Sequence, residues 1–115
     1  MLSESDNVRL HHMIDASREA VGFVEKCSRQ RFDEDRMLQL AEVRLLEIIG
    51  EAAKRLSDEL RQRYPEVAWR QISRTRDRLS QGYFDVDLDI VWAILSTDLP
   101  ALITQLEEIK RAENG

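Results

Sequence analysis

Residues 37–57 read MLQLAEVRLLEIIGEAAKRLS, and this stretch decides the fold class. Its apolar residues recur every three or four positions, the spacing that places them on one stripe of an α-helix. The stripe continues to residue 60 and consists of Met37, Leu38, Ala41, Leu45, Ile48, Ile49, Ala52, Leu56 and Leu60. We predict one helix of about 45 Å from Glu34 to Arg63, capped by Asp33. Its apolar seam must pack against the same chain or against a second copy.

The sequence on either side of this stretch also indicates helices. We predict a fold of four main helices, the last of them kinked or split at Pro100. The three further helices are expected over Asp6–Cys27, from Val67 or Trp69 to Ser80, and from Asp85 or Asp87 to Arg111. Asp6 is expected to cap the first of these helices and Asp85 or Asp87 the last, and Gly82 to follow the end of the short one. The stretch between residues 28 and 35 is polar and interrupts the helical pattern.

The fold class follows from these helices and from the scarcity of turn residues. The chain has only four glycines and two prolines, and no alternating apolar run bounded by turns indicates a strand. We predict an all-α, up-and-down helical bundle in a single domain over residues 1–115. Gly22 and Gly50 lie inside predicted helices, where glycine is unfavourable, and we interpret them as points of close helix packing.

Composition excludes several classes of protein. The net charge is −5, from 17 Lys and Arg against 22 Asp and Glu, which argues against coating nucleic acid by bulk charge. The single cysteine, Cys27, excludes an internal disulfide and a multi-cysteine zinc site, and we expect no metal or other cofactor. No apolar run approaches the ~20 residues of a membrane span, and the polar N-terminus does not resemble a secretory signal. We therefore expect a cytoplasmic protein that does not associate with membranes.

Positive charge is nevertheless concentrated in residues 61–78, RQRYPEVAWRQISRTRDR. This segment holds six arginines and two acids, a local charge of 6 − 2 = +4. Arginine presents a planar fork of donors that suits phosphate oxygens, and aromatic rings can stack on unpaired bases. We take Arg70, Arg74, Arg78 and Trp69 as candidate RNA contacts. The alternative is a solvated helix face whose arginines pair with acids elsewhere on the chain.

The segment RDRLSQGYFDVDLDIVW (76–92) closely resembles the signature region of the HepT-like toxins, a branch of the HEPN superfamily of helical ribonucleases. The motif is Arg, a polar residue, three more residues, then His-x-Tyr. The resemblance extends to residues 10–20, 37–57, 69–72 and 98–107 and covers more than four-fifths of the chain. On this chain the motif arginine is Arg76, its polar neighbour is Asp77, and the tyrosine is Tyr83. The histidine position holds Gln81.

The resemblance implies metal-independent cleavage of RNA, with tRNA one candidate, at a cleft between two protomers of a homodimer. It also implies a cognate MNT-type nucleotidyltransferase antitoxin that neutralises the toxin by adenylylating Tyr83. The catalytic set it implies is Arg76, Asp77, Gln81 and Tyr83. Because a glutamine side chain does not titrate, we expect this copy to be inactive or weakly active, whether the change from His is natural or engineered. The alternative is a non-catalytic helical module that binds the antitoxin or RNA.

Overall fold

The computed structural model describes residues 1–79 and 86–114. Within these residues the regular elements are helices, which confirms the all-α prediction. They are α1 (Glu4–Val24), α2 (Arg29–Glu34), α3 (Arg36–Lys54), α4 (Asp58–Arg63), α5 (Trp69–Ser73), α6 (Thr75–Leu79), α7 (Leu88–Ala93), the π-helical segment η1 (Ile94–Asp98) and α8 (Leu99–Asn114). Ser80, Gln81, Gly82, Tyr83 and Asp85 lie outside the described residues.

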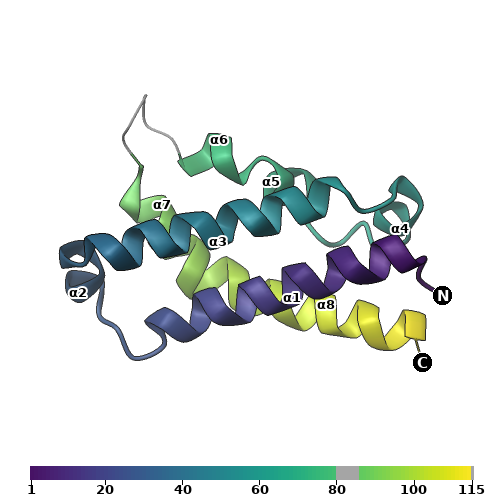
Figure 1. Cartoon of the computed structure of the whole chain (residues 1–115), viewed down its shortest axis with the longest axis horizontal. Helices are drawn as coiled ribbons and strands as arrows, with labels where there is room; N and C mark the ends of the chain where they lie inside the picture. Colours follow the sequence, from purple (N-terminus) through teal and green to yellow (C-terminus); the bar gives the residue numbers. More distant parts are fainter. Residues whose placement is uncertain (80–85, 115) are drawn as a thin grey trace.

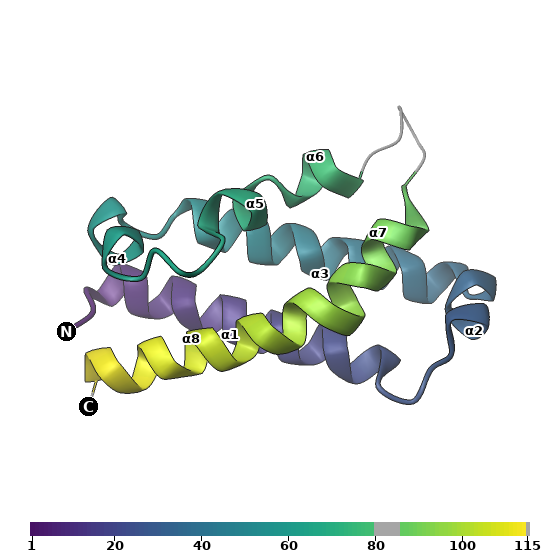
Figure 2. The same ribbon diagram turned by 180° about the vertical axis from the view of Figure 1, so that it is seen from behind.

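The bundle is built from α1, α3 and the rod formed by α7, η1 and α8 (Figures 1 and 2). α1 runs antiparallel to both α3 and α8, so the two ends of the chain lie at the same end of the bundle. α4 also lies at that end, and α5 and α6 return along the outer side of α3. The arrangement therefore leaves the basic segment on the outside of the bundle.

The core forms where α1, α3 and α8 meet. Its fully buried side chains come from all three helices and include Leu10, Met13, Leu46, Leu106 and Ile109. Burying one such side chain contributes about 1.5–3 kcal/mol, so the apolar stripes that predicted the helices also hold them together.

The helix predicted from Glu34 to Arg63 is divided in the structure: Glu34 ends α2, α3 ends at Lys54, and α4 begins at Asp58 after its N-cap Ser57. Ser57 caps α4 through a hydrogen bond that its Oγ accepts from the Leu60 N–H at 3.2 Å. The carboxylate of Asp6 on α1 accepts from the Ser57 backbone N–H at 2.9 Å and from its hydroxyl at 2.6 Å. Apolar periodicity alone could not detect this break, since Leu60 continues the stripe.

Asp6 was expected to cap the first helix, and that prediction is wrong. Ser3 caps α1 by accepting from the Asp6 backbone N–H at 3.0 Å, and Asp6 itself is buried against Ser57. Asp33 does not cap α3 either, because Asp35 accepts from the Leu38 N–H at 3.0 Å. Asp87 does cap α7, as predicted.

The polar stretch after α1 contains a short helix that the sequence pattern did not predict. Ser28 caps α2, whose Phe32 side chain is fully buried. The Phe32 ring packs on Trp92 of α7, with ring centroids 5.3 Å apart. One buried aromatic side chain therefore stabilises a helix too short to show periodicity.

The expected irregularity near Pro100 takes the form of a widened turn. In η1 the N–H of Leu99 donates to the carbonyl of Ile94, five residues back, and the rod then continues into α8. Proline lacks a backbone N–H, so the loss of one helical hydrogen bond is accommodated beside this π-turn.

The predicted third helix is divided at Arg74 into α5 and α6. α5 lies very close to α3, since a Cβ on Gly50 would stand 3.0 Å from the Ile72 carbonyl oxygen. The packing interpretation is thus confirmed for Gly50. It is wrong for Gly22, where a Cβ would meet nothing within 4 Å.

Candidate functional site

The motif arginine, Arg76, lies on α6 with its side chain 81% exposed. The first and last residues of α6, Thr75 and Leu79, are buried, so α6 packs on the bundle while Arg76 points outward. The Nε of Arg76 donates to Oε2 of Glu47 on α3 at 3.2 Å, and Nη2 lies 3.2 Å from the same oxygen. The structure therefore couples the motif arginine to a carboxylate almost thirty residues earlier in the chain.

Asp77, the polar neighbour of Arg76 in the motif, belongs to the catalytic set that the family resemblance implies. It is exposed on α6, and within the described residues it is Glu47 that contacts Arg76. Local spacing could not reveal Glu47, because its pairing depends on how α6 packs on α3. The sequence signal nearest to it is Gly50, one turn further along α3, which permits that close packing.

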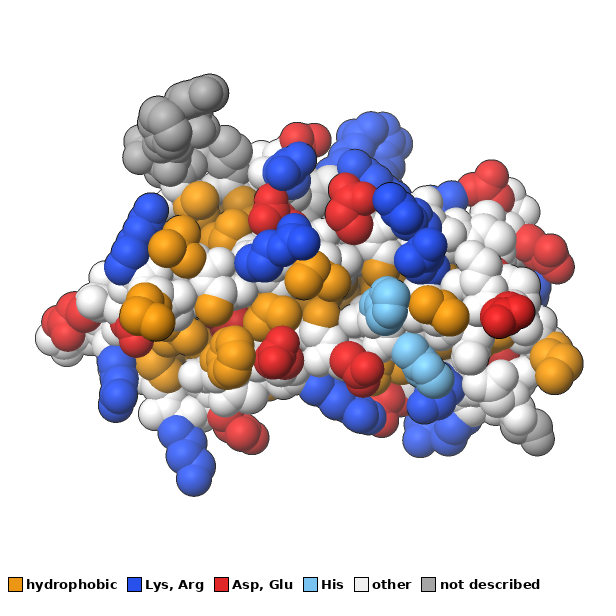
Figure 3. Space-filling view, viewed as in Figure 1, with side chains coloured by type: hydrophobic (Ala, Val, Ile, Leu, Met, Phe, Trp, Pro, Cys, Tyr) orange, Lys and Arg blue, Asp and Glu red, His pale blue; other side chains and the backbone are white. Residues whose placement is uncertain are grey.

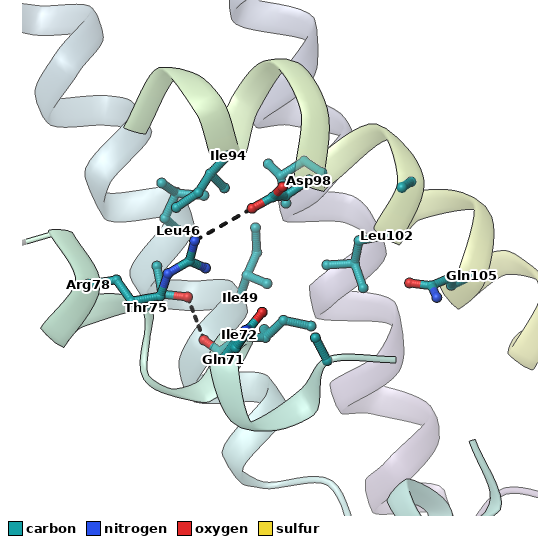
Figure 4. A pocket seen from close by; sticks show the side chains of 13 residues that line it. Leu46, Ile49, Gln71, Ile72, Thr75, Arg78, Ile94, Asp98, Leu102 and Gln105 are labelled. Atoms are coloured by element: carbon teal, nitrogen blue, oxygen red, sulfur yellow. Dashed lines mark hydrogen bonds and ion pairs between the residues drawn. The ribbon is translucent and has the colours of Figure 1, made fainter. Parts of the chain in front are cut away.

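Arg78 points away from Arg76, toward the rod of α7, η1 and α8. Its Nη2 lies 3.6 Å from Oδ2 of Asp98 in η1. Figure 4 shows this ion pair beside a cavity of about 240 Å³ between α5, α6 and the rod, with Ile49 and Leu102 among its apolar walls. The Arg78 side chain is 38% exposed and paired with Asp98, so it is less available to RNA than the sequence suggested.

Arg70 and Arg74 remain exposed on α5 and at its end. Both line a shallow groove of about 750 Å³ between α4 and α5, together with Arg61. Neither forms an ion pair with any residue in 1–79 or 86–114. Basic side chains gather over α5 in the space-filling view (Figure 3). Two of the candidate RNA contacts, Arg70 and Arg74, therefore lie exposed in this groove.

The two arginines at the start of the basic segment are instead engaged by acids. Arg61 pairs with Asp58, and Arg63 binds Glu59 at 3.2 Å and Glu113 of α8 at 2.7 Å. The alternative of a structural role holds for these residues.

Glu113 also connects α8 to the residue that ends α4. It accepts a hydrogen bond from the Tyr64 hydroxyl at 2.6 Å. The pKa of Glu113 is lowered below its ordinary value, mainly by the hydrogen bond from Tyr64 and next by the one from Arg63. The bond between Tyr64 and Glu113 also raises the pKa of Tyr64. Tyr64 is thus held in this cluster rather than presented to bases.

Trp69, expected to stack on RNA, lies in the core with only 8% of its surface exposed. Its indole N–H donates to the carbonyl of Tyr64 at 2.9 Å. At this burial the ring presents little of its face to a base, although Trp69 also lines the groove with Arg70 and Arg74.

The remaining motif positions, Gln81 and Tyr83, lie outside the described residues. The chain on either side of them is held together, because the backbone N–H of Asp87 donates to the carbonyl of Leu79 at 2.8 Å. The described residues before and after the motif segment therefore meet at the end of α6.

Two other kinds of feature are absent from residues 1–79 and 86–114. No helix there is both long enough and apolar enough to cross a membrane. In the same part of the chain no group of three or more His, Cys, Asp or Glu side chains is placed to bind a metal ion.

Comparison with known proteins identifies relatives along most of the chain. The family described as "Ribonuclease HepT-like" matches residues 13–109. A Thermococcus cleftensis protein named "Probable ribonuclease HepT" is 35% identical over 97 residues, covering 81% of this chain and 88% of its own. A Caldanaerobacter subterraneus protein named "Putative RNase" is 36% identical, covering 90% of this chain and 93% of its own. No solved structure matches the chain at a significant level.

Proposed function

This chain belongs to the ribonuclease HepT-like family, and we propose that it is the toxin of a type II toxin–antitoxin pair whose fold is built to cut RNA without a metal ion. The observation that carries the proposal is the exposed guanidinium of Arg76, which opens the family motif on a helix seated firmly on the bundle. In this copy the Gln81 position weakens cleavage, so RNA binding is retained better than catalysis.

The chemistry explains the choice of residues. In metal-free cleavage the ribose 2′-hydroxyl attacks the adjacent phosphorus, which requires a proton acceptor, a proton donor for the leaving 5′ oxygen, and positive charge on the phosphorane oxygens. Arg76 supplies the permanent charge, which counts most as negative charge develops in the transition state. Histidine titrates near neutral pH and can move the protons, whereas glutamine can only form hydrogen bonds. Loss of general acid–base catalysis typically costs about 10² to 10⁴ in rate.

A second copy of the chain completes the cleft in this proposal. Hydrophobic side chains gather over α1 and α3 in Figure 3, and Phe23 and Met37 are 48% and 81% exposed. Arg76 contacts α3 through Glu47, so a copy seated on this face would lie beside the motif arginine. Light scattering at micromolar concentration should give twice the 13.4 kDa of one chain, and a species of 13.4 kDa alone would exclude the shared cleft.

The proposed antitoxin is an MNT-type nucleotidyltransferase that adenylylates Tyr83. AMP on this tyrosine would place negative charge beside Arg76 and fill the cleft, and both effects oppose RNA binding. After co-expression with such an enzyme, mass spectrometry should find a gain of one or more AMP units on the peptide that contains Tyr83. An unmodified peptide would remove this part of the proposal.

The Gln81 position also favours a second candidate, a non-catalytic helical module that binds the antitoxin or RNA. The two candidates differ in the effect of restoring the histidine. In the first, Gln81→His restores the missing proton transfer, so RNA cleavage rises by about 10²-fold or more. In the second, the variant remains inactive because the rest of the catalytic set is not used.

The experiment compares the present chain with Gln81→His and Gln81→Asn, using a labelled single-stranded RNA without added metal and with EDTA. Gln81→Asn is the matched control, since asparagine keeps an amide and does not titrate. Cleavage by Gln81→His alone supports the nuclease, and the double variant Gln81→His/Arg76→Ala should lose it. Equal inactivity of all variants would reject the nuclease in favour of the binding module.

A further inference from the structure

We propose that Glu47 is a positioning residue that sets the direction in which Arg76 presents its guanidinium to an RNA phosphate. This inference rests on the proposed function and adds to it a residue from α3, which neither the family motif nor local sequence spacing includes. The observation behind it is the pair of contacts, each 3.2 Å, between one oxygen of Glu47 and the Nε and Nη2 atoms of Arg76.

The two partners differ in how firmly they are held. The Glu47 side chain is 23% exposed on a long, well-packed helix, whereas that of Arg76 is 81% exposed. The backbone of Arg76 is held in place because Thr75 and Leu79, at the two ends of α6, are buried. Without a partner, the long side chain of Arg76 would sample several rotamers in solution. Glu47 is therefore the fixed group, and Arg76 is the group that it orients.

The geometry of the contact leaves the rest of the arginine free to bind. A guanidinium has five N–H donors in a planar fork. Glu47 occupies the edge formed by Nε and Nη2, so the adjoining edge formed by Nη1 and Nη2 keeps its donors. Two parallel donors on that edge suit bidentate binding of a phosphate. Pairing with Glu47 thus orders Arg76 before RNA binds and leaves its phosphate-binding edge open.

Substituting Glu47 distinguishes a positioning role from a simple charge effect, because the two predict opposite changes in RNA affinity. The neighbouring Glu51 is exposed on the same helix and provides the matched control. Removing an acid near a phosphate site should by charge alone strengthen RNA binding. If Glu47 orients Arg76, Glu47→Gln should weaken binding of a labelled single-stranded RNA to the present chain about threefold, while Glu51→Gln leaves it unchanged or slightly tighter. Tighter binding by Glu47→Gln, measured by fluorescence anisotropy, would overturn the inference.

The second readout is cleavage in the Gln81→His background. There Glu47→Gln should lower kcat about 10-fold or more with little change in KM, because small misplacements of a catalytic group are costly. Adding Glu47→Gln to Arg76→Ala should cause no further loss, since positioning acts only through that arginine. Additive losses in this double-mutant cycle would instead mean that Glu47 acts independently, and would reject the inference.

The two readouts separate this inference from the proposed function. If Gln81→His does not cleave RNA, the nuclease proposal fails, and the opposite responses of Glu47→Gln and Glu51→Gln in RNA binding still support the positioning of Arg76. If Gln81→His cleaves RNA and Glu47→Gln changes neither binding nor kcat, the nuclease proposal stands and the role of Glu47 is rejected.

Discussion

The two ends of the basic segment contain the same kind of residue in different environments. At the α4 end, Arg61 and Arg63 pair with acids, and Arg63 ties α4 to the last turn of α8 through Glu113. At the α5–α6 end, Arg70 and Arg74 are exposed without an ion pair to any described residue. The local charge of +4 therefore overstates the charge available to RNA, and only the fold distinguishes structural arginines from those that can bind.

Arg76 belongs to the second group, although it too has a carboxylate partner. The difference lies in the burial of the pair: the side chains of Arg63 and Glu113 are 38% and 8% exposed, whereas those of Arg76 and Glu47 are 81% and 23% exposed. An arginine clamped between two acids contributes to tertiary structure. An exposed arginine held by a single acid along one edge keeps the other edge for a ligand.

Replacing each of these two arginines by alanine is the strongest test of the comparison. In the Gln81→His background, Arg76→Ala should lower cleavage about 10² to 10³-fold, the cost of losing one donor to a developing oxyanion, without changing the thermal midpoint. Arg63→Ala should lower the thermal midpoint and leave kcat intact. Cleavage assays and thermal denaturation of both variants check the pair, and a loss of kcat in Arg63→Ala would contradict the division.

Acids in this protein, like the arginines, differ in whether the fold gives them a partner. Glu42 on α3 is fully buried, and neither of its carboxylate oxygens has a hydrogen-bond partner among the described residues. Burial, with a smaller contribution from Glu19, raises the pKa of Glu42 from 4.5 to about 8. Glu113, which has several partners, shifts in the opposite direction.

Because Glu42 holds its proton in the folded state and releases it when unfolded, stability should fall as the pH rises from 4.5 to about 8. Substitution by Met, which is similar in length and apolar, should raise the free energy of unfolding by about 1–3 kcal/mol at pH 7 and remove this decline. Urea denaturation between pH 5 and pH 8, run on the present chain and the Glu42→Met variant, measures both effects. A decline of equal slope in both proteins would assign it to another group.

The smallest expected effect concerns the salt dependence of RNA binding. Removing Arg70 and Arg74 together should reduce the slope of log K against log[salt] by up to about 1.4, or about 0.7 for each phosphate contact on a single strand. Arg18→Ala is the control, since Arg18 pairs with Glu107 away from this groove and its loss should change the slope little. Anisotropy titrations at several salt concentrations distinguish these variants. Equal slopes would show that the groove between α4 and α5 does not contact phosphates.

Local signals predicted much of the fold. The spacing of apolar residues in α1, α3 and α8 reports which side of each helix is buried, and it indicated the bundle. Gly50 indicated a close approach, and Asp87 a helix start, from single residues. The break at Ser57 was missed because the apolar stripe passes through it, and α2 was missed because one buried ring, Phe32, stabilises it.

The sequence by itself determined the all-α class, because apolar periodicity is a property of neighbouring residues, while the resemblance to the family motif implied positions 76, 77, 81 and 83 as the site. The tertiary structure alone decided that Asp6 would bind Ser57, that Glu113 would engage Arg63, and that Glu47 would hold Arg76. Each of these contacts joins residues about thirty to fifty positions apart. No local pattern encodes such a pair, since it depends on the register in which complete helices pack.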